Sequence, residues 1–325
     1  FKVGGSFFLL TWIIIILCLF SSKIQSCLIF LHWVKLPSFI WSYTAKSGCQ
    51  NKRVTTFDGE TLGAWHYDAK HHDTSQESIV IYAHGRAGSR RAPRRVRTYQ
   101  QLLAAYKPTR GLITFDYRGF GDSSGFPTEA TSMIDVISMY DYAVNVTKAR
   151  HVIIHGHSLG TGISMNSVEF ILERSRQARL EILKRHGILS KLSSQAQEKM
   201  LDLPHDRLKM VVLESPFSSL ISAAQSHWSM FPLQISPKFI QNFIFSRLEI
   251  KFDTMSRFKT LPDDLPVLLL HGELDKIIPY NESKKLFETR KHNTKLVLFP
   301  QAGHNTISFQ YNFKQIIEDF IRENI

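Results

Sequence analysis

The strongest constraint on the fold is the alternation of short apolar runs with longer amphipathic stretches, which begins near Thr55 and continues to the end of the 325-residue chain. The apolar runs lack polar alternation, which is typical of parallel strands covered by helices on both faces. We expect six such strands, at Ser78–Ala83, Gly111–Asp116, His151–His155, Lys209–Glu214, Pro266–His271 and Lys295–Phe299. The pattern predicts an α/β fold around a mostly parallel sheet.

Two further strands and two long insertions complete the expected domain. Lys52–Phe57 and Leu62–Tyr67 flank Asp58-Gly59, a dipeptide that favours a hairpin turn, so an antiparallel pair should precede the parallel series. Residues 165–207 and 216–262 are both longer than a strand connection requires. We expect consecutive helices in the first and a helical cap over the functional site in the second. The aromatic residues of the second insertion suit either packing between its helices or an apolar ligand.

The N-terminal part differs in character, and we divide the chain into a membrane-anchoring segment, 1–36, and an α/β domain, 37–325. Val3–Ser22 has no formal charge, and as a helix rising about 1.5 Å per residue it would span about 30 Å, the thickness of the bilayer hydrocarbon core. A transmembrane helix is the favoured interpretation, with a cleaved signal or a buried helix as alternatives. Ile24–Leu36 suits a helix lying at a membrane interface.

The chain carries a net charge of +12 and has an isoelectric point near 9.6, which favours anionic partners such as lipid surfaces and phospholipid head groups. A solvated basic surface explains the charge equally well. No aromatic platform or recognised nucleic-acid motif accompanies it, so we expect no nucleic-acid partner. The three cysteines all precede residue 50 and cannot form a disulfide framework for the α/β domain.

The clearest chemical motif is Gly156-His157-Ser158-Leu159-Gly160, which follows an apolar run and precedes a helix-compatible segment. In this strand–turn–helix context the turn is so tight that small residues must flank the serine, and its hydroxyl stands clear of the sheet edge. The sequence therefore predicts Ser158 as a nucleophile. The amide of Leu159 is left free to bind a developing oxyanion.

A serine hydroxyl attacks a carbonyl only when a base removes its proton. The loop after the strand at Pro266–His271 carries Asp275, and the loop after the last strand carries His304. Both loops lie at the carboxyl edge of a parallel sheet, where ligands bind. We predict that His304 is the base for Ser158 and that Asp275 orients it.

Several other titratable residues lie near strand ends or in the same loops. Glu273 lies two residues before Asp275 and is an alternative acid. Asp116 and Asp122 are interpreted as loop-bracing residues. The remaining histidines at strand ends are expected to satisfy local hydrogen bonds: His84, His155, His157 and His271.

A second oxyanion donor is expected from His84-Gly85-Arg86-Ala87-Gly88, where the glycines permit close backbone approach and the amide of Arg86 faces the site. A cluster of arginines surrounds this loop: Arg86, Arg90, Arg91, Arg94, Arg95 and Arg97. Since arginine binds phosphate and carboxylate well, we predict that Arg90 and Arg94 contact an anionic substrate head group. A solvated helix face or contact with anionic lipid is the alternative. No metal and no organic cofactor is implied.

Four motifs follow one another in register: His84–Gly88, Phe115–Ser123, Gly156–Gly162 and Leu213–Phe217. Together they resemble the membrane-bound lysophosphatidylserine and monoacylglycerol lipases, member twelve of the α/β-hydrolase-domain proteins and its relatives, from about Lys52 onward. The resemblance implies the α/β-hydrolase fold and a single-pass protein of the endoplasmic reticulum membrane with a lumenal catalytic domain. Two glycosylation sequons, at Asn145 and Asn281, are compatible with that placement.

The chain departs from these relatives in ways that concern the substrate more than the triad. Arg86 stands where they usually have asparagine, and the segment around Glu181–Arg207 resembles an insertion. The spacing from Asp275 to His304 is also shorter than expected.

The expected function is therefore hydrolysis of lipid acyl esters, lysophospholipids and monoacylglycerols, through an acyl-enzyme. Two rivals remain: an acyl-protein thioesterase or peptidase that uses the same triad, and a non-catalytic binding module on the same fold. The sequence leaves the oligomeric state open.

Overall fold

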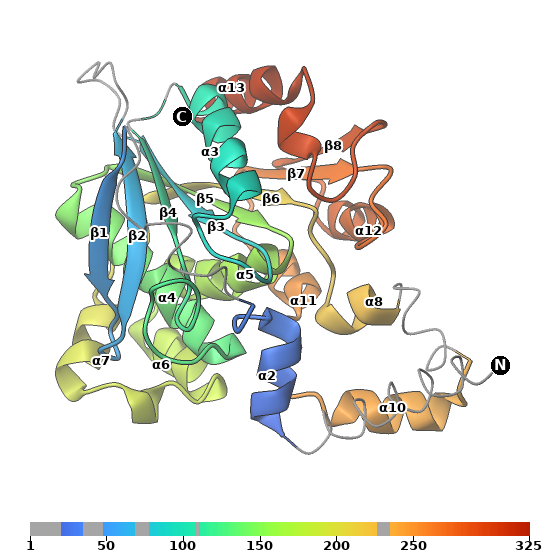
Figure 1. The fold of residues 1–325 in the computed structure, drawn as a ribbon. Helices are drawn as coiled ribbons and strands as arrows, with labels where there is room; N and C mark the ends of the chain where they lie inside the picture. The colour runs from blue at the N-terminus through green and yellow to red at the C-terminus, as the bar shows by residue number, and fades with distance from the viewer. Residues whose placement is uncertain (1–20, 35–47, 69–77, 108, 110, 226–234) are drawn as a thin grey trace.

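The computed structural model describes residues 21–34, 48–68, 78–107, 109, 111–225 and 235–325. All eight strands predicted from the sequence are present, in one sheet of order β1-β2-β4-β3-β5-β6-β7-β8 (Figure 1). The strands are β1 (Gln50–Thr55), β2 (Thr61–Asp68), β3 (Ser78–Ala83), β4 (Gly111–Phe115), β5 (His151–His157), β6 (Leu208–Glu214), β7 (Val267–Gly272) and β8 (Thr294–Phe299). β2 runs antiparallel to both β1 and β4, and all other neighbours are parallel. The predicted hairpin and parallel series are confirmed.

The central strands are buried on both faces, which explains why their sequences lack polar alternation. In β3, Ile79 and Ile81 belong to one apolar cluster, whereas Val80 and Tyr82 belong to the other. Successive strand side chains point to opposite faces, so a continuous apolar run fills both cores.

Helices cover both faces of the sheet (Figure 1). Buried side chains of α3 (Pro93–Ala105) and α13 (Phe313–Asn324) join one core cluster. The larger cluster, on the other face, includes side chains of α4 (Glu129–Asp141), α5 (Leu159–Leu172), α11 (Thr254–Lys259) and α12 (Asn281–Thr289). Short helical turns η1 (Tyr142–Val146) and η4 (Ile307–Phe309) complete these layers.

Both long insertions contain helices in the residues that the structure describes. The first contains most of α5 and then α6 (Arg176–Arg185), η2 (Leu189–Lys191) and α7 (Ser194–Leu201). The buried guanidinium of Arg179 donates hydrogen bonds to the carbonyls of Ile171, Leu201 and Leu203, which ties this insertion to the end of α5. The described part of the second contains α8 (Leu220–Gln225), α10 (Lys238–Ser246) and α11.

The N-terminal segment differs from the sequence expectation where it is described. Residues 3–20 of the predicted membrane span lie outside the described residues. A helix, α2 (Ser22–Phe30), ends where Leu31 adopts a left-handed conformation with φ of 49°, so it is shorter than the interfacial helix expected up to residue 36. Phe30 is fully buried against Phe120 and Phe252, which makes this end of α2 part of the domain core. Among the described helices, none has both the length and the apolar character needed to cross a membrane.

Candidate active site

The loop that carries Ser158 is a sharp turn between β5 and α5. Ser158 has φ of 53° and ψ of −123°, a backbone conformation that residues other than glycine rarely adopt, and its buried neighbours hold it there. A Cβ atom on Gly160 would lie 2.1 Å from the carbonyl oxygen of Ala83, and one on Gly156 would lie 2.8 Å from the carbonyl oxygen of Gly160. Both glycines are therefore required by close backbone approach.

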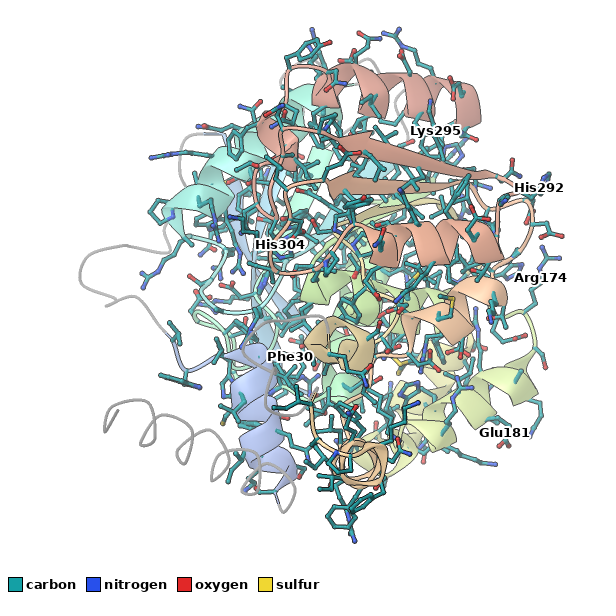
Figure 2. The ribbon with its side chains drawn as sticks, turned by 90° about the vertical axis from the view of Figure 1, so that its right-hand side faces the viewer. Phe30, Arg174, Glu181, His292, Lys295 and His304 are labelled. Atoms are coloured by element: carbon teal, nitrogen blue, oxygen red, sulfur yellow. The ribbon has the colours of Figure 1, made fainter. Side chains whose placement is uncertain are left out.

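The structure brings together the three side chains predicted as a triad, which come from loops after three different strands. The imidazole Nε2 of His304 lies 2.9 Å from the hydroxyl oxygen of Ser158, and its Nδ1 lies 2.7 Å from Oδ2 of Asp275. All three residues are buried. With the Nδ1 proton directed at Asp275, Nε2 is free to accept the proton of the serine hydroxyl. Figure 2 labels His304, on the loop that follows β8.

Asp275 is held as a carboxylate. Burial raises the pKa of this carboxyl, but hydrogen bonds from His271 and His304 outweigh burial, and the pKa lies well below its ordinary value. The amides of Ile277 and Ile278 also donate to its Oδ1, at 2.8 and 2.9 Å. The alternative acid, Glu273, is exposed on the same loop. Asp275 is therefore the carboxylate that contacts the imidazole.

The two amides predicted as oxyanion donors lie beside Ser158. Leu159 is the first residue of α5, so its amide has no acceptor within the helix. On the other side, a Cβ atom on Gly85 would lie 3.1 Å from Cβ of Ser158, which places the loop of Arg86 against the nucleophile. Neither amide has a hydrogen-bond partner in the part of the chain that the structure describes.

The histidines at strand ends make the local hydrogen bonds expected of them. Nε2 of His157 lies 3.1 Å from the carbonyl oxygen of His304, which fixes the loop that carries the base. His84 contacts the carbonyl of Gly85, and His155 lies between Tyr106 and Glu214. Burial lowers the pKa of His84 and of His157 to about 4, so both rings are neutral at neutral pH.

A pocket of about 340 Å³ opens onto Ser158 and His304. This volume lies at the lower end of the range for small-molecule sites. Its other lining residues are Leu31, Tyr82, Gly85, Arg86, Ala87, Arg94, Arg95, Thr98, His157, Glu214, Ile277 and Asn305. No described residue of the two insertions lines it. The sequence does not predict Leu31, which directly follows α2, or Glu214 as pocket residues, because only the tertiary fold brings the end of α2 and the end of β6 to this site.

The structure contradicts the prediction that Arg90 binds substrate. The guanidinium is fully buried, and its Nη1 lies 2.6 Å from Asp116 Oδ2 and 2.5 Å from Asp122 Oδ1. Both carboxylates that were expected to brace loops are thus satisfied by Arg90. Arg94 is exposed and lines the pocket, where it can meet a ligand. Their spacing along the chain does not show which of these two arginines is buried, since the direction of each side chain depends on where α3 begins.

Residues 80–315 match the alpha/beta hydrolase family. The chain is similar to the lysophosphatidylserine lipase ABHD12 of Danio rerio, with 28% identity over 92% of this chain and 78% of that protein. The Mus musculus protein of the same name is 29% identical over 81% of this chain, which spans 63% of that relative's length. Human ABHD12B is 28% identical over 81% of this chain and 70% of that protein. These matches confirm the resemblance predicted from the four motifs.

Solved structures with the same fold are more distant in sequence. An esterase of Pyrococcus furiosus, Pf2001, superposes with a TM-score of 0.58 at 18% identity, over 89% of this chain and 96% of that one. An alpha-beta hydrolase of Vibrio vulnificus gives a TM-score of 0.61 at 16% identity, over 93% and 91% of the two chains. At this level of identity the likeness confirms the fold.

Proposed function

The chain belongs to the alpha/beta hydrolase family, and on that premise we propose that it is a serine hydrolase that cleaves the acyl esters of lysophospholipids and monoacylglycerols. The observation that carries the proposal is the continuous hydrogen-bonded series from Ser158 through His304 to Asp275. The names of its relatives, lysophosphatidylserine lipases, support a lipid ester as the substrate.

The proposed mechanism follows from this geometry. His304 removes the hydroxyl proton as Ser158 attacks the ester carbonyl, and the negative charge of Asp275 stabilises the imidazolium that forms. The amides of Leu159 and Arg86 stabilise the oxyanion of the tetrahedral intermediate. His304 then protonates the departing alcohol, which leaves the acyl group on Ser158. A water molecule, deprotonated by His304, releases the fatty acid and restores the serine.

Arg94 is the proposed contact for an anionic head group. Its position at the pocket mouth would place positive charge near the phosphate of a lysophospholipid whose ester lies at Ser158. A monoacylglycerol lacks that phosphate. We therefore expect Arg94→Met to raise KM for lysophosphatidylserine several-fold and to leave KM for monooleoylglycerol unchanged.

Membrane attachment through the uncharged N-terminal stretch, with a lumenal catalytic domain in the endoplasmic reticulum, is part of the same proposal. Asn145 and Asn281, the acceptors of the two sequons, are both exposed and therefore accessible to glycosylation. Treatment with an endoglycosidase should increase the electrophoretic mobility of the protein made in eukaryotic cells. An Asn145→Gln/Asn281→Gln double variant should migrate like the treated protein.

The function is tested with a substrate panel in detergent micelles: lysophosphatidylserine, lysophosphatidylcholine, monooleoylglycerol and an acyl-thioester peptide. Ser158→Ala should lower fatty-acid release from the preferred lipid by about 10³-fold or more. Ser164→Ala is the matched control, because this buried serine of α5 has a hydroxyl without a hydrogen-bond partner among the described residues. Preference for the thioester would support the thioesterase rival. Absence of turnover of every substrate by the wild type would support a binding module.

A further inference from the structure

The guanidinium of Arg95 binds the loop that supplies the Arg86 amide. Nη2 of Arg95, in the first turn of α3, donates to the carbonyl oxygens of three consecutive residues: Gly85 at 2.8 Å, Arg86 at 3.3 Å and Ala87 at 2.6 Å. Converging carbonyls of this kind repel one another, so a cation among them stabilises an arrangement that the loop would otherwise avoid.

The direction of the Arg86 amide follows from the geometry of the peptide group. The carbonyl of Gly85 and the N–H of Arg86 belong to the same planar unit, and in a trans peptide they point in opposite directions. Arg95 holds the Gly85 carbonyl together with the buried ring of His84, whose Nδ1 lies 2.7 Å from the same oxygen. The Arg86 N–H must therefore face away from that guanidinium. All peptide bonds of the described chain are trans.

The opposite side of the loop is held by α2. The amide of Ala87 donates to the carbonyl of Phe30 at 2.9 Å, and the Arg86 side chain donates to the carbonyl of Leu28 at 2.8 Å. These bonds use the Ala87 amide and turn the Arg86 side chain toward α2, yet they leave the Arg86 amide free. Ala87 has φ of 59°, a left-handed conformation that costs free energy for a residue with a Cβ atom and needs such support.

We propose that Arg95 is a positioning residue for the reaction: it orients the loop Gly85–Ala87 so that the Arg86 amide meets the oxyanion, with α2 as the opposing support. The inference rests on the proposed esterase function. It assigns to Arg95 a role different from that of Arg94, although both are basic and both line the pocket.

The role predicts a specific kinetic pattern for Arg95→Met, which removes the donors and keeps much of the aliphatic stem. With p-nitrophenyl butyrate, an uncharged substrate, kcat should fall on the order of 10²-fold, the range for loss of one oxyanion donor. KM should stay within about twofold of the wild type, since ground-state binding does not use the oxyanion donors. Arg97→Met, an exposed arginine of α3 that does not line the pocket, should retain wild-type kinetics.

An inhibitor distinguishes positioning from loss of folded enzyme. A trifluoromethyl ketone forms a hemiketal with Ser158 and places an oxyanion in the same position as the tetrahedral intermediate. Its Ki should rise in Arg95→Met by the factor by which kcat/KM falls. A variant that is only less stable would show a smaller active fraction, by fluorophosphonate titration, with an unchanged Ki.

Arg95→Lys keeps the charge on a shorter side chain, which places its ammonium farther from the three carbonyls that Nη2 contacts, so we expect an intermediate loss of about tenfold in kcat. This variant decides the matter if Arg95→Met does not fold. Wild-type kcat and Ki in a folded Arg95 variant, beside an active wild type, would overturn the positioning role and leave the esterase function standing. A wild type that neither hydrolyses esters nor reacts with fluorophosphonate would overturn both.

Discussion

Replacement of Arg90 by methionine should destabilise the domain without altering its head-group preference. The guanidinium has no solvent exposure, pairs with Asp116 and Asp122, and lies 5.3 Å from the centre of the Trp65 ring. Methionine replaces much of the aliphatic part of the arginine side chain but leaves Asp116, which is also fully buried, without its cation. The backbone amide of Arg90, 2.5 Å from the Asp116 Oδ1, would remain as a donor.

The expected cost is large because one partner of a buried ion pair is removed and the other stays. Such changes destabilise proteins by about 3–5 kcal/mol. For a domain of this size that corresponds to a fall in Tm on the order of 6–15 °C. A stability near the middle of the typical range, about 10 kcal/mol, would leave most molecules folded at 25 °C, so kinetics can still be measured.

Urea denaturation followed by tryptophan fluorescence measures the free energy of unfolding of Arg90→Met. The matched control is the double variant Arg90→Met/Asp116→Asn, which removes the uncompensated charge and should recover part of the lost stability. The ratio of kcat/KM for lysophosphatidylserine to that for monooleoylglycerol should equal the wild-type ratio in both. Unchanged stability together with an altered ratio would refute the structural role and restore Arg90 as a head-group contact.

Two further changes test the packing and the protonation states around the site. Gly160→Ala should abolish most activity and destabilise the fold by about 1–3 kcal/mol, because its Cβ would lie 2.1 Å from the carbonyl oxygen of Ala83 and 2.7 Å from that of His84. The control is Gly303→Ala, whose Cβ has room, and this variant should melt within about 2 °C of the wild type. His84 and His157 have pKa values of about 4 in the folded chain against about 6.5 when unfolded, so the unfolded chain binds protons first as pH falls. The free energy of unfolding should therefore be highest above pH 6.5 and should fall between pH 6.5 and 4, by roughly 3 kcal/mol per histidine. A urea midpoint that stays constant from pH 7 to 4.5 would contradict this.

The strand pattern was predictable because both faces of the central strands are buried. Apolar runs such as Ser78–Ala83 leave no polar face for solvent, and their boundaries in the structure differ from the prediction by two residues at most. The elbow at Ser158 was predictable for a related reason. Only glycine fits at positions 156 and 160, where backbone segments approach closely, so the two glycines of the motif indicate this geometry.

Side-chain direction and long-range packing were not predictable from the same patterns. Arg90, Arg94 and Arg95 lie within six residues, yet Arg90 is buried against two aspartates, Arg94 is exposed and lines the pocket, and Arg95 donates to three carbonyls of one loop. Their roles depend on partners that lie elsewhere in the chain. The same holds for α2, whose apolar sequence suited a membrane interface but whose Phe30 packs in the domain core.

The central claim is that convergence of Ser158, His304 and Asp275 turns one hydroxyl into a nucleophile. Peptide mass spectrometry after brief reaction with a fluorophosphonate locates and quantifies that reactivity. We predict a single adduct, on Ser158, and a rate of labelling that falls by at least about 10³-fold in His304→Ala, by analogy with the loss of a triad member. Labelling of another serine, or of Ser158 at the wild-type rate in His304→Ala, would contradict the claim.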